Sequence, residues 1–125
     1  MYRYERDSVM KKCISKYGTK NQMDMCIEEM SELTKAILKY RRKTKEIFGG
    51  DSMEVKEEIS KEKIDEYNYA RQAIIDELAD VEIMCRQMEI MLVARDEVDS
   101  RIDFKLMRQL KRLEGKDDED KQSVL

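Results

Sequence analysis

The sequence predicts an all-α protein, a bundle of about four to five helices. The chain of 125 residues contains no proline and only four glycines, so residues that interrupt helices are rare. Lys, Glu, Met, Ile and Leu are abundant, which favours helices over a turn-rich β fold. Apolar residues also recur every three or four positions over long segments, the period of an amphipathic helix.

The first two predicted helices are separated by one glycine. Residues 3–17 carry apolar side chains at helical spacing, and Gly18 is expected to end that helix. Thr19 followed by Gln22 is interpreted as a capping box that opens the second helix, which should run to about Lys45. The apolar stripe of the second helix consists of Met23, Cys26, Met30, Leu33, Ile37 and Tyr40.

The clearest break in the chain is I-F-G-G-D-S at residues 47–52. Asp51 with Glu54 is interpreted as the next N-cap, and the charged residues 53–69 are predicted to form a solvated helix or a helical extension. A second clean stripe begins after Ala70. Its members are Ile74, Leu78, Val81, Cys85, Met88 and Leu92.

The end of the chain is predicted to be a polar connector, a short helix and a tail. Residues 95–100 are interpreted as the connector and residues 102–113 as the last helix. We therefore expect one all-α domain over residues 1–114 and a disordered acidic tail over residues 115–125.

Composition and charge exclude several classes of function. The net charge is −3 with acidic and basic residues interleaved, so we expect no nucleic-acid partner. No apolar run approaches the roughly 20 residues that span a bilayer, and the N-terminus lacks an apolar signal core, so we expect a cytoplasmic protein without a membrane partner. The odd number of cysteines, three, indicates reduced thiols. Because the chain has no histidine, its chemistry must use carboxylates, lysines, tyrosines or a metal.

The balance of apolar and charged residues predicts self-association. Hydrophobic residues make up 41% of the chain and charged residues 42%. A chain of this size buries a modest fraction of its surface alone, so we expect a homo-oligomer that buries further helix faces. A coiled-coil scaffold is the competing interpretation of this composition.

Two clusters of carboxylates lie next to the two apolar stripes. The segment C-I-E-E-M-S-E-L-T-K-A contains Glu28, Glu29 and Glu32, and the segment I-I-D-E-L-A-D-V-E-I-M contains Glu77 and Asp80. Carboxylates three positions apart project from one helix face. If the two helices pack antiparallel through their stripes, both clusters can face one shared cleft.

Carboxylates that share a cleft repel one another unless their pKa values rise or a hard cation neutralises them. A set of oxygen ligands without His or Cys suits Mg²⁺, with Mn²⁺ as a substitute, better than zinc or iron. Mg²⁺ keeps several waters and binds through carboxylates together with substrate phosphates, so the implied ligand is a phosphate ester or nucleotide. Ordinary charges on helix flanks are the alternative.

The two acidic segments resemble the MazG-like all-α nucleoside triphosphate pyrophosphohydrolase superfamily, whose signature is an E-E-x-x-E helix followed by an E-x-x-D helix. The matching residues are Glu28-Glu29-x-x-Glu32 and Glu77-x-x-Asp80. The later I-D-F-K-L-M-R-Q-L-K-R-L is similar to the K-L-x-R-L pattern that often follows in this family. The resemblance covers roughly residues 19–113.

The resemblance implies a homodimer or dimer-based tetramer that hydrolyses a (deoxy)nucleoside triphosphate to the monophosphate and pyrophosphate with Mg²⁺. It implies Glu29, Glu32, Glu77 and Asp80 as metal ligands, with Glu29 also catalytic. Glu28 would be an accessory catalytic carboxylate that either supports the ligands without touching the metal or orients water. Water would attack the α-phosphorus. The cellular role would be removal of non-standard nucleotides or control of a dNTP pool. The charged segment 44–69 makes the interval between the motifs longer than in compact members, which leaves the choice of substrate open.

Several polar residues are candidates for substrate binding, each with a structural alternative. They are Gln22, Lys35, Lys39, Lys105 and Arg108. The lysines and the arginine could contact phosphates or form ion pairs on helices. Gln22 could bind a base edge or serve the capping box, and Tyr67 and Tyr69 could stack on a base or cover a helix face.

Two other functions stay open at the level of sequence. One is a relative that acts on phosphoribosyl-ATP, and the other is a non-enzymatic helical scaffold or adaptor whose acidic pairs are surface charge.

Overall fold

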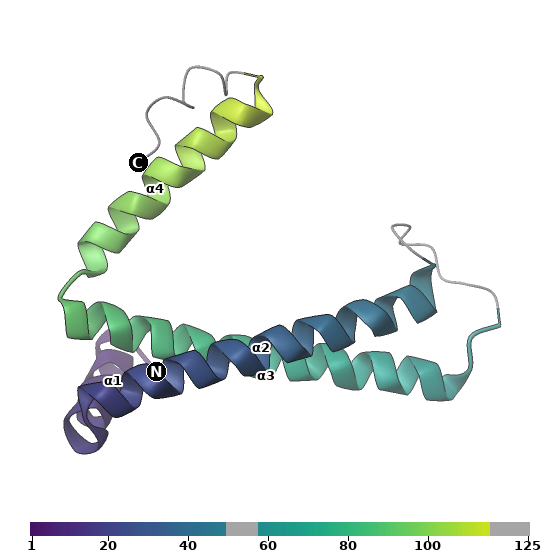
Figure 1. Ribbon diagram of the computed structural model, residues 1–125, viewed down its shortest axis with the longest axis horizontal. Helices are drawn as coiled ribbons and strands as arrows, with labels where there is room; N and C mark the ends of the chain where they lie inside the picture. Colours follow the sequence, from purple (N-terminus) through teal and green to yellow (C-terminus); the bar gives the residue numbers. More distant parts are fainter. Residues whose placement is uncertain (50–57, 116–125) are drawn as a thin grey trace. The chain divides into compact units, whose positions relative to one another are not determined.

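The computed structural model describes residues 1–49 and 58–115, and these residues form four α-helices and no strands (Figure 1). The helices are α1 Arg3–Tyr17, α2 Thr19–Phe48, α3 Lys61–Leu92 and α4 Arg95–Leu113. The predicted all-α fold is therefore confirmed. The predicted cap at Asp51 and Glu54 and the acidic tail beyond Gly115 lie outside the described residues.

The chain divides into two compact units, Met1–Met88 and Glu89–Leu125. The first unit contains α1, α2 and most of α3, and the second contains the end of α3 and α4. None of the described helices has the length and apolar character needed to cross a membrane.

Gly18 separates α1 from α2 without a side-chain cap. α1 has the predicted bounds, and Gly18 ends it with a φ of 92° and an N–H that donates to the Ile14 carbonyl. The predicted capping box is wrong, because no side chain caps α2, and the Gln22 N–H donates to the Gly18 carbonyl. The Gln22 side chain is 7% exposed. It lies among the buried residues of the helix rather than at its open end.

α2 continues three residues beyond the predicted end. Gly49 adopts a left-handed conformation, and its N–H donates to the Lys45 carbonyl at 3.1 Å, which is a common way to end a helix. The last turn is held by packing, since Ile47 is buried and the Phe48 ring meets the Tyr67 ring edge-on at 5.7 Å.

α3 is one continuous helix from Lys61 to Leu92, so residues 61–69 of the charged segment are helical as expected, whereas residues 58–60 precede the helix. The Lys63 N–H donates to Ser60 Oγ at 3.3 Å. This contact satisfies one of the free N–H groups at the start of α3, and the sequence analysis did not identify it.

α4 begins earlier than predicted, so the connector over residues 95–100 is wrong. The break between α3 and α4 is confined to Val93, which has a φ of 51°, and Ala94. Asp96 and Glu97 lie in the first turn of α4, where negative charge is favourable next to the helix N-terminus. The acidic residues that suggested a connector are therefore typical of a helix start.

In the first unit, α2 and α3 lie side by side and run antiparallel (Figure 1). The Tyr40 and Tyr67 hydroxyls are 3.0 Å apart, and Lys43 Nζ donates to Glu66 Oε2 at 2.9 Å. The buried residues of this unit are Cys26, Ile47, Ala70, Met84, Gln22 and Gln87. The contact face of the two helices is thus partly polar.

The predicted apolar stripes are only partly buried. Cys26 is 6% exposed, whereas Met30 is 47% exposed and Ile37 is 46% exposed. The prediction that the helices pack through these stripes is therefore correct for only part of each stripe. The rotation of the helices turns polar residues inward and leaves apolar residues of both helices on the surface.

Candidate functional site

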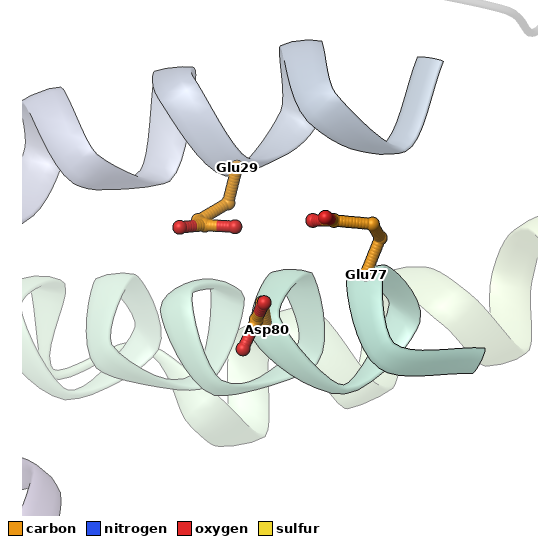
Figure 2. Close-up of side chains that lie close together, drawn as sticks. All are labelled: Glu29, Glu77 and Asp80. Atoms are coloured by element: carbon orange, nitrogen blue, oxygen red, sulfur yellow. The ribbon is translucent and has the colours of Figure 1, made fainter. Parts of the chain in front are cut away.

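Three of the predicted carboxylates converge from two helices. Glu29 on α2 faces Glu77 and Asp80 on α3 (Figure 2). One carboxylate oxygen from each residue can be chosen so that all three lie within 4.8 Å of one another. The spacing of Glu77 and Asp80 by three residues places both on one side of α3, as predicted.

The position of this cluster follows from the buried residues around it. Glu29 is three residues after buried Cys26 on α2, and Asp80 is four residues before buried Met84 on α3. Side chains three and four positions apart share a helix face. The carboxylates therefore lie on the α2–α3 contact face, and Glu29 and Glu77 are half-buried while Asp80 is exposed.

The cluster carries negative charge without a matching cation. Partial burial, followed by the charges of Asp80 and Glu77, raises the pKa of Glu29 above its ordinary value. Among the described residues, no ion pair joins Glu29, Glu77 or Asp80 to a basic side chain. The helix pair thus holds like charges together at a cost in free energy.

Glu77 also contains an unsatisfied acceptor. Its Oε2 atom is shielded from solvent and has no hydrogen-bond partner in the described part of the chain. Burying an acceptor without a donor is unfavourable, and more so for a charged group. A cation or a proton at this position would remove the penalty.

These residues fit a hard divalent cation. All three offer carboxylate oxygens, which Mg²⁺ and Mn²⁺ prefer over softer ligands. Three protein carboxylates would leave further coordination positions for water and for substrate phosphate. The raised pKa of Glu29 and the orphan oxygen of Glu77 are both relieved by a positive charge at the cluster.

The other two predicted carboxylates lie beside the cluster rather than in it. Glu28 is exposed, and its charge contributes to the raised pKa of Glu29. Glu32 is exposed, and its Oε1 is 3.4 Å from Lys35 Nζ. At about 100° per residue, half-buried Leu33 is aligned with buried Cys26 on the contact face. Glu32 lies on the exposed edge of that face, one turn after Glu29. The role of Glu32 as a ligand stays a prediction.

The predicted substrate-binding residues are dispersed. Lys35 pairs with Glu32, and Lys39 places its Nζ 5.5 Å from the centre of the Tyr69 ring. Gln22 lies buried on α2.

Lys105 and Arg108 belong to α4 in the second unit, where Lys105 is exposed and Arg108 is half-buried.

One buried polar residue was missed by the sequence analysis. Gln87 is 3% exposed, and its Oε1 has no hydrogen-bond partner among the described residues. The sequence contained one sign that Gln87 would be buried, since this polar residue stands among the apolar residues Met84, Cys85 and Met88.

Comparisons of the chain with protein-family models, with curated proteins and with solved structures gave no match.

Proposed function

We propose that this protein is a Mg²⁺-dependent nucleoside triphosphate pyrophosphohydrolase of the MazG-like kind. The observation that carries the proposal is the convergence of Glu29, Glu77 and Asp80 from α2 and α3. The same residues occupy motif positions in the resemblance noted from the sequence. Carboxylates gathered at one place, one of them with a raised pKa, are typical of functional sites.

In this proposal Glu29, Glu77 and Asp80 hold the cation, with Glu32 as the further ligand that the motif suggests. The bound ion would neutralise phosphate charge and lower the pKa of a coordinated water. Water attacks the α-phosphorus, the bond between the α-phosphorus and the bridging oxygen breaks, and pyrophosphate leaves. A carboxylate must accept the proton of the water, because the chain has no histidine. Glu28, which is exposed beside the cluster, would orient that water.

The proposal includes a homodimer or a dimer-based tetramer in the cytoplasm. Exposed apolar side chains on α2 support self-association, since Ile27 is 64% exposed and Met30 and Ile37 are close to half exposed. Contiguous exposed apolar surface usually marks an interface. No disulfide joins Cys13, Cys26 and Cys85, all three of which lie in the described residues, and this is consistent with a reducing compartment.

The direct test is a panel of ribo- and deoxynucleoside triphosphates, together with phosphoribosyl-ATP, incubated with the full chain and Mg²⁺ or Mn²⁺. We expect release of pyrophosphate and a nucleoside monophosphate in equal amounts for at least one nucleotide. Release of orthophosphate in place of pyrophosphate would contradict the assigned bond. The absence of any hydrolysis would favour the scaffold function.

A further inference from the structure

A concave site separate from the carboxylate cluster lies on the same helix pair, nearer the C-terminus of α2. It is a pocket of about 410 Å³ in the first unit. Its lining residues are Lys39, Lys43, Asp65, Glu66 and Tyr69. None of these residues belongs to the carboxylate cluster, and only Lys39 and Tyr69 were noted from the sequence.

The groups that line the pocket differ in their availability. Lys43 Nζ is 2.9 Å from Glu66 Oε2 and 3.6 Å from Glu46 Oε2, so these charges satisfy one another. Lys39 and Asp65 take part in no ion pair with another described residue. Lys39 Nζ lies over the Tyr69 ring, 5.5 Å from its centre. The Lys39 ammonium and the Asp65 carboxylate can therefore contact a ligand next to that ring.

The structure also distinguishes the two tyrosines that the sequence offered for base stacking. The Tyr67 hydroxyl is hydrogen-bonded to that of Tyr40, and its ring packs against Phe48, so Tyr67 has a structural role. Tyr69 is 72% exposed and lines the pocket. Its ring is the aromatic surface that a ligand in the pocket could reach.

The pocket lies within reach of a nucleotide bound at the carboxylates. Tyr69 precedes Glu77 by eight residues on α3, which corresponds to about 12 Å along the helix axis. Lys39 follows Glu29 by ten residues on α2, or about 15 Å. An extended nucleotide with its phosphates at the cluster can place its opposite end at this pocket.

We propose that the pocket is the nucleobase subsite of this protein, with the base stacked on Tyr69. The inference depends on the proposed function, because the carboxylates are taken to hold the phosphates. Asp65 accepts a hydrogen bond from an N–H of the base, and Lys39 donates one to a base acceptor. An exposed aromatic ring can stack on any of the bases, so stacking does not distinguish them. The discrimination between bases therefore comes from Asp65 and Lys39.

The charges of the pocket favour the base over the phosphate end of the nucleotide. Its lining carries two ammonium groups and two carboxylates, so it has no net positive charge. The unpaired carboxylate of Asp65 would repel a terminal phosphate. The aromatic ring, one donor and one acceptor match what a nucleobase presents.

The test measures binding of α,β-imido nucleoside triphosphates with different bases by calorimetry in Mg²⁺, alongside kcat/KM for hydrolysis. We expect Tyr69→Ala to weaken binding about 5- to 10-fold, while Tyr69→Phe keeps wild-type affinity. Asp65→Asn should change the rank order of the bases, because an amide both donates and accepts. Tyr17→Ala is the matched control, since Tyr17 is also exposed and has Lys16 Nζ 5.4 Å from its ring centre.

Inorganic tripolyphosphate separates the two ends of the nucleotide. Its affinity should be the same for the wild type and Tyr69→Ala, and weaker binding to the variant would overturn the base assignment. If the wild type hydrolyses nucleotides and Tyr69→Ala behaves like Tyr17→Ala, the subsite is wrong while the proposed function stands. If the wild type neither binds nor hydrolyses any nucleotide, both proposals fail.

Discussion

Two regions of the α2–α3 pair differ in how their charged groups are satisfied. At one end Lys43 contacts both Glu46 and Glu66, and Tyr40 is hydrogen-bonded to Tyr67. Near the middle of α3, three carboxylates meet without a basic partner among the described residues. The same two helices therefore provide a charge-matched region and a region with excess negative charge.

The difference shows which region is stable without a bound ligand. Hydrogen bonds, ring packing and opposite charges stabilise the matched region without any ligand. The carboxylate region is destabilised by repulsion and by the orphan Glu77 Oε2 until a positive charge arrives. We therefore expect substitutions in the matched region to change stability and substitutions in the carboxylate region to change binding and activity.

The largest expected effect is the loss of hydrolysis in Asp80→Asn. The substitution keeps the size of the side chain and removes one charge from the cluster, so kcat/KM at limiting Mg²⁺ should fall on the order of 100-fold or more. Glu82→Gln is the matched control, because Glu82 is exposed on α3 and rotated away from Asp80. Equal pyrophosphate release by both variants would contradict the assignment of Asp80.

Tyr67→Ala should have the largest effect in the matched region. It removes the ring that packs against Tyr40 and Phe48 and leaves the Tyr40 hydroxyl without its partner. The free energy of unfolding should fall by about 2 kcal/mol in urea titrations. Tyr69→Ala removes an exposed ring, and we expect a change within about 0.5 kcal/mol. A similar loss in both variants would show that Tyr67 has no special role in packing.

Glu29→Gln should stabilise the protein in the absence of metal. The pKa of Glu29 is raised in the folded state. At pH values between the ordinary pKa and the raised pKa, the folded state therefore binds more protons than the unfolded state. The free energy of unfolding therefore falls as pH rises through that window, and the penalty is fully present above it. Removing the charge should recover about 0.5 kcal/mol at a pH above the window. A loss of stability in EDTA at this pH would argue against repulsion at the cluster.

Lys43→Met should produce the smallest effect. The hydrogen bond and the charge of Lys43 hold the pKa of Glu66 below the ordinary value. The pair therefore stabilises the folded state at pH values above the ordinary pKa, and this stabilisation is lost as the pH falls through the lowered pKa. Thermal unfolding should show a slightly lower Tm than wild type at pH 7 and equal Tm values at strongly acidic pH. A Tm difference that grows on acidification would contradict the assigned contact.

The sequence predicted the presence of all four described helices, although no residue of α1 or α4 is buried. α1 has the predicted bounds, and α2 and α3 contain the predicted stripes. The errors lie at helix ends, where the backbone geometry determines which residue begins or ends the helix. Gly18 ends one helix and starts the next without a side-chain cap, and the break at Val93 has no glycine or proline to reveal it. The acidic residues at the start of α4 are also common in loops, but negative charge is favourable at a helix N-terminus.

The candidate site was predictable in part. Spacing alone placed Glu77 and Asp80 on one face, and the pairing of α2 with α3 brought Glu29 to them. The spacing allowed Glu32 either a ligand role or an ion pair with Lys35 on the same helix. It did not show that Glu32 would be exposed, because exposure depends on the rotation of α2 against its neighbour. The pocket at Tyr69 depends on the same rotation and on contacts between residues distant in sequence.

The most direct test of the central claim is a Mg²⁺ titration followed by thermal unfolding of the full chain. The wild type should gain about 2.7 kcal/mol of stability when Mg²⁺ reaches a hundred times its Kd. Glu77→Gln should need at least about tenfold more Mg²⁺ for the same gain, and Glu82→Gln should match the wild type. If Mg²⁺ and Mn²⁺ leave the unfolding of the wild type unchanged, or stabilise Glu77→Gln equally, the three carboxylates do not form a metal site.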